Sequence, residues 1–262
     1  MPSHSCMPPA TDHQEPAPAG AARVVVFTGG IRPLPDSGRP TGMYKQPVAA
    51  PVELGLDGFV GDRQADRRVH GGPEKAVHLF PASHYCVLAR AFPTAAQWLV
   101  PGSIGENLSS ADLDERDVRV GEVWRVGQAL LQACQPRSPC WKIDERFGCR
   151  GMAAFIVEQR ITGWYWRVLL PGVVQPRDRL VREQAAPQAP SLRRALEIWY
   201  AQPASIEQLE RLAGTAGIAT HWRQRIEQRV AWLREQSRGA SPGASPGASP
   251  GASPGTEKPR AA

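Results

Sequence analysis

Short stretches of branched, aromatic or alternating apolar residues dominate residues 23–183 and restrict what this chain can fold into. Gly and Pro turns separate them, which is typical of β-strands rather than of long helices. The clearest examples are RVVVF (23–27), AVHLF (76–80), EVWRV (122–126), ALLQACQ (129–135) and WYWRVLL (164–170). Helical spacing of apolar residues is limited here to residues 83–92 and 151–162. We therefore predict a mainly β fold with some α-helix, built as a closed or partly closed barrel rather than a doubly wound sheet.

The C-terminal third of the chain has a different, helical composition. The stretch APQAP (186–190) predicts a linker between a domain at residues 23–185 and a helical unit at residues 191–237. Within that unit, Ser205 and Gln208 form the sequence pattern of a capping box. The last helix carries one apolar stripe, which consists of Ile218, Trp222, Ile226, Val230 and Leu233. These features predict a small C-terminal three-helix domain.

Both ends of the chain differ from the part between them. Residues 1–22 are rich in Pro and Ala without periodic apolar residues, and residues 238–262 repeat the unit GASP before a polar end. Neither composition can bury a core, so we predict a disordered N-terminal arm and a disordered C-terminal tail.

Composition also limits the setting in which the protein works. Charges or prolines interrupt the apolar stretches, so no membrane span is predicted. The five cysteines form an odd set without a CxxC pair and without a preceding signal peptide, which predicts reduced thiols and a cytoplasmic location. The net charge is +6, and residues 191–238 carry eight Arg and five Glu. A basic three-helix module that binds nucleic acid was therefore considered, but charges of both signs interspersed along a helix indicate a solvated face instead.

Cys140 lies in the rigid, polar stretch QPRSPCWK (135–142). Pro139 restricts its own backbone and that of the residue before it, and the stiff turn gives the thiol a fixed direction. Arg137 and Lys142 favour the thiolate, which is the form that ligates metals and attacks electrophiles. From this local sequence alone, an inert buried cysteine is an equally good interpretation.

Two glycine-rich segments accompany this cysteine. The stretch LGLDGFVGDRQADRRVHGGPEKAVH (54–78) allows backbone N–H groups to form anion-binding turns, and Asp62, Arg63, Asp66 and His70 place both signs of charge beside them. The stretch GSIGENLS (102–109) is a second such turn, with Glu106 and Asn107. Neither segment has the GxGxxG or Walker pattern, so an ordinary dinucleotide or ATP loop is not predicted.

In their order along the chain, four motifs resemble the MOSC domain of the bacterial YiiM group. They are KQP at Lys45, GLDGFVGDRQADRRVHGG (55–72), GENLS (105–109) and QPRSPCWK (135–142). The helical unit also lies where that group carries a small three-helix domain, so the resemblance covers residues 23–236. It implies a β-barrel-like fold that binds the molybdenum cofactor, a molybdopterin whose dithiolene sulfurs hold the metal. It also implies that Cys140 is both the protein ligand to molybdenum and the catalytic residue.

The resemblance assigns further cofactor-binding residues by their motif positions. We expect Lys45 and Arg137 to contact the phosphate or the pterin, because cations match that charge. Gly71 and Gly72 would let the backbone approach the pterin, and His70 and Asn107 would donate hydrogen bonds to pterin or oxo groups. Asp62 would orient one of the cations. The full set is Lys45, Asp62, His70, Gly71, Gly72, Asn107, Arg137 and Ser138.

The implied activity is the reduction of N-hydroxylated small molecules, such as hydroxylaminopurine base analogues, as in the related amidoxime-reducing components. No cysteine set here suits an iron–sulfur cluster and no flavin motif is present, so a separate flavin or iron–sulfur reductase is the expected electron donor. The three-helix domain is expected either to cover the mouth of the active site or to support a homodimer.

Other functions remain as alternatives at this point. The protein could carry the cofactor or deliver sulfur without reductase turnover. A zinc site from His70, His78, His84 and Cys86 is disfavoured, because their spacing fits no compact ligand motif. Sulfurase activity is also disfavoured, because the chain has no room for the pyridoxal-phosphate domain that sulfurases join to a MOSC domain.

Overall fold

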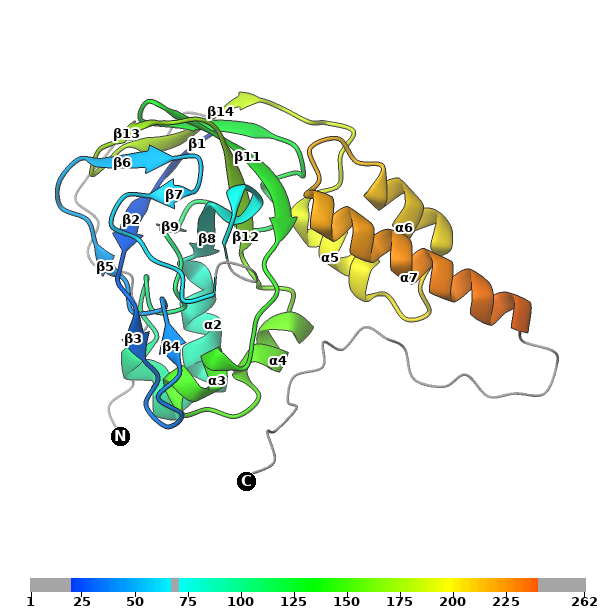
Figure 1. The fold of residues 1–262 in the computed structure, drawn as a ribbon, viewed down its shortest axis with the longest axis horizontal. Helices are drawn as coiled ribbons and strands as arrows, with labels where there is room; N and C mark the ends of the chain where they lie inside the picture. The colour runs from blue at the N-terminus through cyan, green and yellow to red at the C-terminus, as the bar shows by residue number, and fades with distance from the viewer. Residues whose placement is uncertain (1–19, 67–70, 240–262) are drawn as a thin grey trace.

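The computed structural model describes residues 20–66 and 71–239 (Figure 1). The predicted disordered arm and tail fall almost entirely outside these ranges. Ala21 and Ala22 lie in a strand and the last helix extends to Gly239, so most of the described residues of the predicted arm and tail have regular structure.

Most strands belong to one nine-stranded sheet within the described residues. Its neighbours pair antiparallel except for β8 and β9, which are parallel. In sheet order the strands are β1 (Ala21–Arg23), β14 (Arg179–Gln184), β10 (Val123–Val126), β11 (Ala129–Pro136), β12 (Trp164–Leu170), β8 (Val77–Pro81), β9 (Leu108–Ser110), β2 (Val25–Thr28) and β5 (Gln46–Pro47). Four of the five strands expected from the sequence are present as single strands, and the fifth, at residues 23–27, is divided at Val24 between β1 and β2.

The predicted barrel is wrong in one respect, because the hydrogen-bonded sheet is open. Strand β1 is one edge of it and β5 the other, and no pairing among the described residues joins them. Only Val24 separates β1 from β2, although β1 pairs with β14 and β2 pairs with β9. A single short segment therefore runs from one end of the sheet to the other, so the sheet must curl strongly. The two ends are connected there by the covalent chain and not by hydrogen bonds between strands.

Two small sheets flank the large one. Strands β13 (Gly172–Val174), β6 (Val52–Gly55) and β7 (Gly58–Phe59) form the first. Strands β3 (Arg32–Pro33) and β4 (Pro40–Thr41) form a short hairpin that extends away from the sheet toward the helices at the lower end of the molecule (Figure 1).

The core of the sheet is dominated by large apolar side chains on alternating strand positions. Trp124, Trp164 and Trp166 are at most 1% exposed. Trp166 packs edge-to-face against the other two rings, at centroid distances of 6.2 and 5.9 Å. These rings hold β10 and β12 in place around β11.

A second hydrophobic core lies beneath the sheet and is built by short helices. They are α2 (Ser83–Ala91), η2 (Pro93–Trp98), α3 (Lys142–Phe147) and α4 (Met152–Glu158). The short helix η1 (Pro73–Lys75) precedes β8 and buries none of its residues. Phe80 from β8 packs there with Leu88, Ile143 and Met152, all of them fully buried. Helices α2 and α4 confirm the two predicted helical stretches.

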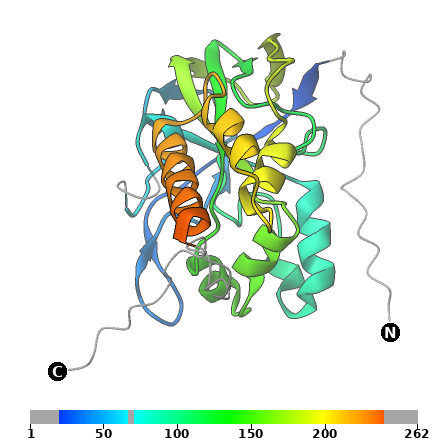
Figure 2. The ribbon, with the colours of Figure 1, turned by 90° about the vertical axis from the view of Figure 1, so that its right-hand side faces the viewer.

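Three further helices stand beside the sheet, next to β11 and β12 (Figures 1 and 2). They are α5 (Leu192–Tyr200), α6 (Ile206–Ala213) and α7 (Thr220–Gly239). The Ser205 hydroxyl accepts a hydrogen bond from the Gln208 N–H at 3.3 Å, as a capping residue does. Of the predicted stripe, Ile218 lies just before α7, whereas Trp222, Ile226 and Val230 lie on it. All four are buried in the core cluster that also contains the sheet tryptophans, and Leu233 packs partly buried against it.

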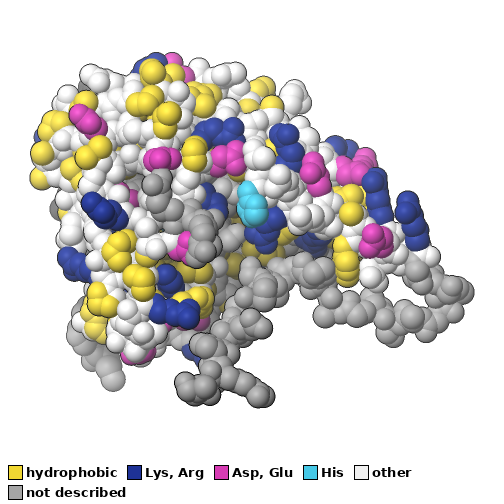
Figure 3. Space-filling view, viewed as in Figure 1, with side chains coloured by type: hydrophobic (Ala, Val, Ile, Leu, Met, Phe, Trp, Pro, Cys, Tyr) yellow, Lys and Arg dark blue, Asp and Glu magenta, His cyan; other side chains and the backbone are white. Residues whose placement is uncertain are grey.

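The structure also shows how the surface charges are distributed and which cysteines are free. On the face in Figure 3, Lys and Arg side chains alternate with Asp and Glu over the three-helix unit. Cys134, Cys140 and Cys149 carry free thiols, but Cys86 is disulfide-bonded, so the expectation of reduced thiols throughout is wrong for that residue. Among the described helices, none combines the length and apolar character needed to cross a membrane.

Candidate functional site

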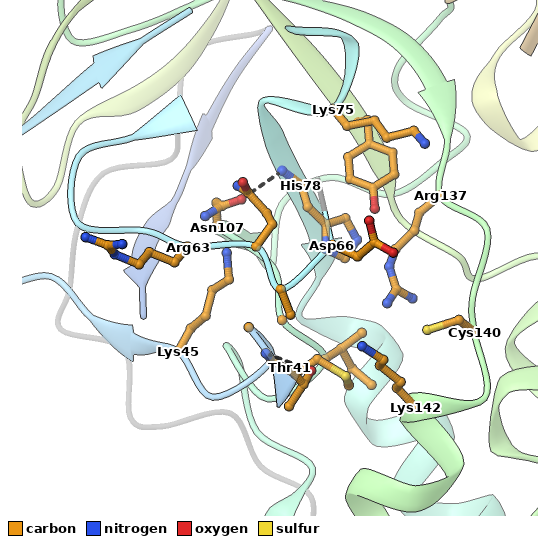
Figure 4. Close-up of a pocket in the computed structure, with 17 residues that line it drawn as sticks. Thr41, Lys45, Arg63, Asp66, Lys75, His78, Asn107, Arg137, Cys140 and Lys142 are labelled. Atoms are coloured by element: carbon orange, nitrogen blue, oxygen red, sulfur yellow. Dashed lines mark hydrogen bonds between the residues drawn. The ribbon is translucent and has the colours of Figure 1, made fainter. Parts of the chain in front are cut away.

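The motif segments meet around one pocket of about 580 Å³, a volume that includes its opening to solvent (Figure 4). Its wall consists of the loop before β5, the loop after β7, the loop before β9, the start of β8 and the segment from the end of β11 to the start of α3. The lining residues are Thr41, Gly42, Met43, Lys45, Arg63, Gln64, Ala65, Asp66, Lys75, His78, Ile104, Gly105, Asn107, Arg137, Cys140, Lys142 and Tyr165.

A buried ion pair forms one side of the pocket. Lys45 Nζ lies 2.7 Å from Asp62 Oδ2, and these side chains are only 4% and 1% exposed. Burial lowers the pKa of Lys45, and the Asp62 carboxylate opposes that shift. Asp62 also accepts a hydrogen bond from the Gly29 N–H at 3.0 Å. Lys45 thus presents a cation to the pocket from a fixed position.

Asn107 joins this pair to the sheet. Its amide nitrogen donates to Asp62 Oδ2 at 2.9 Å and to the Phe27 carbonyl at 3.3 Å, while its oxygen accepts from the His78 N–H at 3.1 Å. Both amide N–H donors therefore have partners within the protein. In this structure Asn107 orients Asp62 and, through it, Lys45.

Glu106 supports the same loop from inside the second core. One of its oxygens accepts from the Tyr85 hydroxyl at 2.5 Å and from the Gly102 N–H at 2.6 Å. Burial raises the pKa of this carboxyl, whereas the hydrogen bonds and the nearby Lys45 oppose the shift. The glycine-rich turn GSIGENLS is held in shape by these contacts.

Arg137 is a buried cation on the opposite side of the pocket. The residue is 5% exposed, and its backbone N–H donates to the Gly163 carbonyl at 3.0 Å. Its Nη1 atom is buried and has no hydrogen-bond partner among the described residues. A buried guanidinium N–H without a partner is costly in a folded protein, so this atom is suited to a bound anion.

Cys140 follows Arg137 and directs its sulfur into the pocket between Arg137 and Lys142 (Figure 4). The Cys140 carbonyl accepts from the Ile143 N–H at 3.0 Å, which fixes the turn before α3. Cys134, six residues earlier, is different. Its thiol is fully buried against the Glu74 and Tyr165 carbonyls, and burial raises the pKa of Cys134 to about 12.

The structure brings together some of the expected site residues but not all of them. Lys45, Asn107, Arg137 and Cys140 line the pocket, and Asp62 lies directly behind Lys45. Three others are absent from its described wall: Gly71 and Gly72, which precede η1, and Ser138, which is exposed. His70 lies outside the described residues.

Other lining residues were not assigned from the sequence. In the sequence, Arg63, Asp66 and Lys142 stand out only as charged residues near the motifs. Lys75 and Tyr165 gave no signal that sequence reasoning could use, since one lies in a turn and the other inside an apolar strand. Strand pairing places Tyr165 opposite His78, which is what brings it to the pocket.

This fold and this pocket fit a domain of the MOSC class. The MOSC domain family matches residues 66–181. Together with the relatives below, this match shows that the chain belongs to the MOSC family. The MOSC domain is a domain type that binds the molybdenum cofactor.

The similar proteins with known names include the bacterial YiiM group of this family. Protein YiiM of Escherichia coli is 34% identical over 206 residues, which are 79% of this chain and 91% of that protein. The uncharacterized protein YflK of Bacillus subtilis is 36% identical over 70% of this chain and 81% of its own length. A crystal structure of the Escherichia coli YiiM matches with a TM-score of 0.70 at 29% identity, over 81% of this chain and 94% of that one. The family resemblance predicted from the motifs is thereby confirmed.

A more distant match is to a much longer protein. A protein of Gibberella moniliformis named "Reductase" is 31% identical over 53% of this chain, which corresponds to 25% of that protein. The matched region is therefore one part of a larger chain there.

The burial of the free thiols leads to a testable order of modification. Among the three described free thiols, we expect iodoacetamide to alkylate Cys140 of the cofactor-free protein first, because Cys134 and Cys149 are buried and Cys140 is half-buried beside an open pocket. Mass spectrometry of tryptic peptides at short reaction times would measure this order. Modification of Cys134 at the same rate as Cys140 would contradict the described geometry.

Proposed function

We propose that this pocket binds the molybdenum cofactor and that the protein reduces N-hydroxylated small molecules, with hydroxylaminopurine base analogues as the leading substrates. The observation that carries the proposal is the placement of a free thiol, Cys140, next to the buried and unpartnered Nη1 of Arg137 in one pocket. A thiolate is a suitable ligand for a soft metal centre, and a guanidinium suits a phosphate. The residues present therefore fit the group that the family implies.

Each wall of the pocket has a distinct part in holding such a cofactor. Cys140 would supply the protein ligand to the metal. Arg137 and Lys45 would bind the phosphate or the pterin from opposite sides, because both are buried cations that face the cavity. Asp62 and Asn107 would keep Lys45 in position rather than contact the cofactor themselves.

The reaction consumes two electrons and two protons, and it converts an N-hydroxylated group into an amine and water. When bound, the cofactor supplies the two-electron reduction that cleaves the N–O bond. The protein must place protons near the departing oxygen. The Nζ of Lys45, whose pKa burial lowers, and the Tyr165 hydroxyl are proton-bearing groups of the pocket.

Electrons would come from a separate flavin or iron–sulfur reductase. The five cysteines contain no set that suits an iron–sulfur cluster, so the chain needs an external donor. The name of the Gibberella relative supports a role in reduction.

Purification from a host that makes the molybdenum cofactor tests the proposal. We expect about one molybdenum and one pterin per chain, together with reduction of N-hydroxylaminopurine by reduced methyl viologen. Protein from a host that cannot make the cofactor is the control and should lack both metal and turnover. Absence of molybdenum from the loaded host, when its other molybdoenzymes are active, would contradict the proposal.

The same experiment separates the reductase from a cofactor carrier. A carrier would contain molybdenum and pterin but would leave every N-hydroxylated substrate unchanged under the same conditions. A carrier would also transfer its cofactor to an apoenzyme faster than the cofactor dissociates into solution.

A further inference from the structure

Glu74 of η1 caps the first turn of α7 in the three-helix unit. The N–H of Thr220, the first residue of α7, lies 3.0 and 2.8 Å from the two Glu74 carboxylate oxygens. The Thr220 hydroxyl donates to Glu74 Oε1 at 3.1 Å. A carboxylate at this place satisfies an N–H that the helix itself leaves free, and it interacts favourably with the positive end of the helix dipole.

The same carboxylate is tied to the sheet. Arg167 of β12 donates from Nη2 to Glu74 Oε1 at 2.8 Å and to the Ile218 carbonyl, just before α7, at 3.2 Å. Both charged side chains are less than one third exposed. Glu74 therefore stands at the junction of η1, β12 and α7.

The backbone of Glu74 is held as firmly as its side chain. Its carbonyl accepts from the Cys134 thiol at 3.1 Å and from the Gln135 side chain at 3.3 Å. The N–H of the next residue, Lys75, donates to the Gly72 carbonyl at 2.9 Å. These contacts fix the direction in which Lys75 leaves the backbone.

Lys75 reaches from this turn into the wall of the pocket (Figure 4). Burial lowers its pKa, and Arg225 of α7 adds to that shift, whereas Cys134 and Glu74 oppose it. Helix α7 thus affects Lys75 in two ways: the charge of Arg225 lowers the Lys75 pKa, and Thr220 holds the neighbouring Glu74.

The three-helix unit packs closely against the sheet at this junction. The N–H of Ala219 donates to the Cys134 carbonyl at 2.9 Å. Gly121 approaches the loop before α7 so closely that an added Cβ would lie 2.4 Å from the Ala216 carbonyl oxygen. Buried residues of α5, α6 and α7 also belong to the same core cluster as the sheet.

We propose that Glu74 is a positioning residue through which the three-helix unit holds Lys75 in the wall of the cofactor pocket. This inference rests on the proposed function, because it gives Lys75 a part in binding the anionic groups of the cofactor. The three-helix unit is then a component of the site. Neither a cover over its mouth nor a surface for a second subunit is needed to explain its position.

A double-mutant cycle tests whether Glu74 acts through Lys75. We expect Glu74→Gln and Lys75→Met each to lower the molybdenum and pterin content of the purified protein about 10-fold, the range for residues that orient a binding group. The double variant should lose no more than Lys75→Met alone. Losses that multiply in the double variant would overturn the proposal, as would wild-type content in Glu74→Gln.

Two further variants control for a general loss of structure. Glu210→Gln removes the negative charge of the ion pair with Arg234 between α6 and α7, and neither residue lines the pocket, so this variant should keep its full cofactor content. Glu74→Asp retains the charge and should restore most of the content that Glu74→Gln loses. A content as low in Glu74→Asp as in Glu74→Gln, or a loss in Glu210→Gln, would contradict the positioning role.

A measurement on the cofactor-free protein separates this inference from the proposed function. The chain has four lysines, Lys45, Lys75, Lys142 and Lys258, so ¹³C-dimethylated lysine signals can be assigned one by one. The Glu74→Gln change should move the Lys75 signal and lower its titration midpoint, because it removes a charge that raises the Lys75 pKa. An unchanged Lys75 signal would overturn the inference whether or not the wild type carries molybdenum.

Discussion

Replacement of Cys140 by serine is expected to remove molybdenum from the purified protein and to lower turnover by more than about 100-fold, the upper range found for residues that only support a metal ligand. A serine hydroxyl keeps the size of the side chain but is a hard donor that stays protonated at neutral pH. The metal content and the rate with reduced methyl viologen measure the two effects. The pterin is expected to be retained in part, because Arg137 and Lys45 are unchanged.

Cys149→Ser is the matched control for this experiment. Cys149 is also a free thiol, but it is buried beneath the sheet next to Thr94 and takes no part in the pocket wall. We expect this variant to keep molybdenum and turnover. Full activity in Cys140→Ser would show that the thiol is not a ligand and would leave the carrier and reductase proposals without their metal contact.

The strands were predictable because each leaves a local pattern. Stretches such as WYWRVLL and ALLQACQ alternate or branch along a few residues and end at turns, and both form strands within one residue of the predicted bounds. Partner choice leaves no such pattern. Nothing near Val24 indicates that the chain changes from β14 to β9 there, so the open edge of the sheet could not be predicted.

The site was predictable where a motif supplied the residue. Lys45, Asn107, Arg137 and Cys140 come from segments up to 95 positions apart, and the motifs placed all four in one pocket. The hydrogen-bond partners of each side chain were harder to predict than its place in the pocket. Asn107 was expected to donate hydrogen bonds to a ligand, but the structure directs both of its donors to Phe27 and Asp62, partners that only the folded chain brings near.

Lys75 shows the limit of sequence reasoning most clearly. Its neighbour Glu74 contacts Thr220, which is 146 positions later in the chain. A charged pair in a short turn normally predicts a solvated surface. The place of Lys75 in the pocket wall becomes visible only in the fold, where the neighbouring Glu74 contacts Thr220 of α7 and Arg167 of β12.

Replacement of Asp62 by alanine is expected to lower the free energy of unfolding by about 3–5 kcal/mol, since it leaves the Lys45 ammonium buried without its partner. The change also removes the acceptor for the Gly29 N–H and for the Asn107 amide. Urea unfolding at pH 7, followed by circular dichroism, gives the value. The exposed pair between Glu207 and Arg211 provides the control, because Glu207→Gln should change the same free energy by less than about 0.5 kcal/mol.

A second change distinguishes the cost of the unpaired charge from a loss of packing. In the Lys45→Met, Asp62→Ala double variant the buried charge is gone, so much of the stability lost in Asp62→Ala should return. Cofactor binding should not return with it, because the double variant lacks the cation that faces the pocket. A double variant no more stable than Asp62→Ala would mean that the hydrogen bonds of Asp62, rather than its pairing with Lys45, hold this side of the site together.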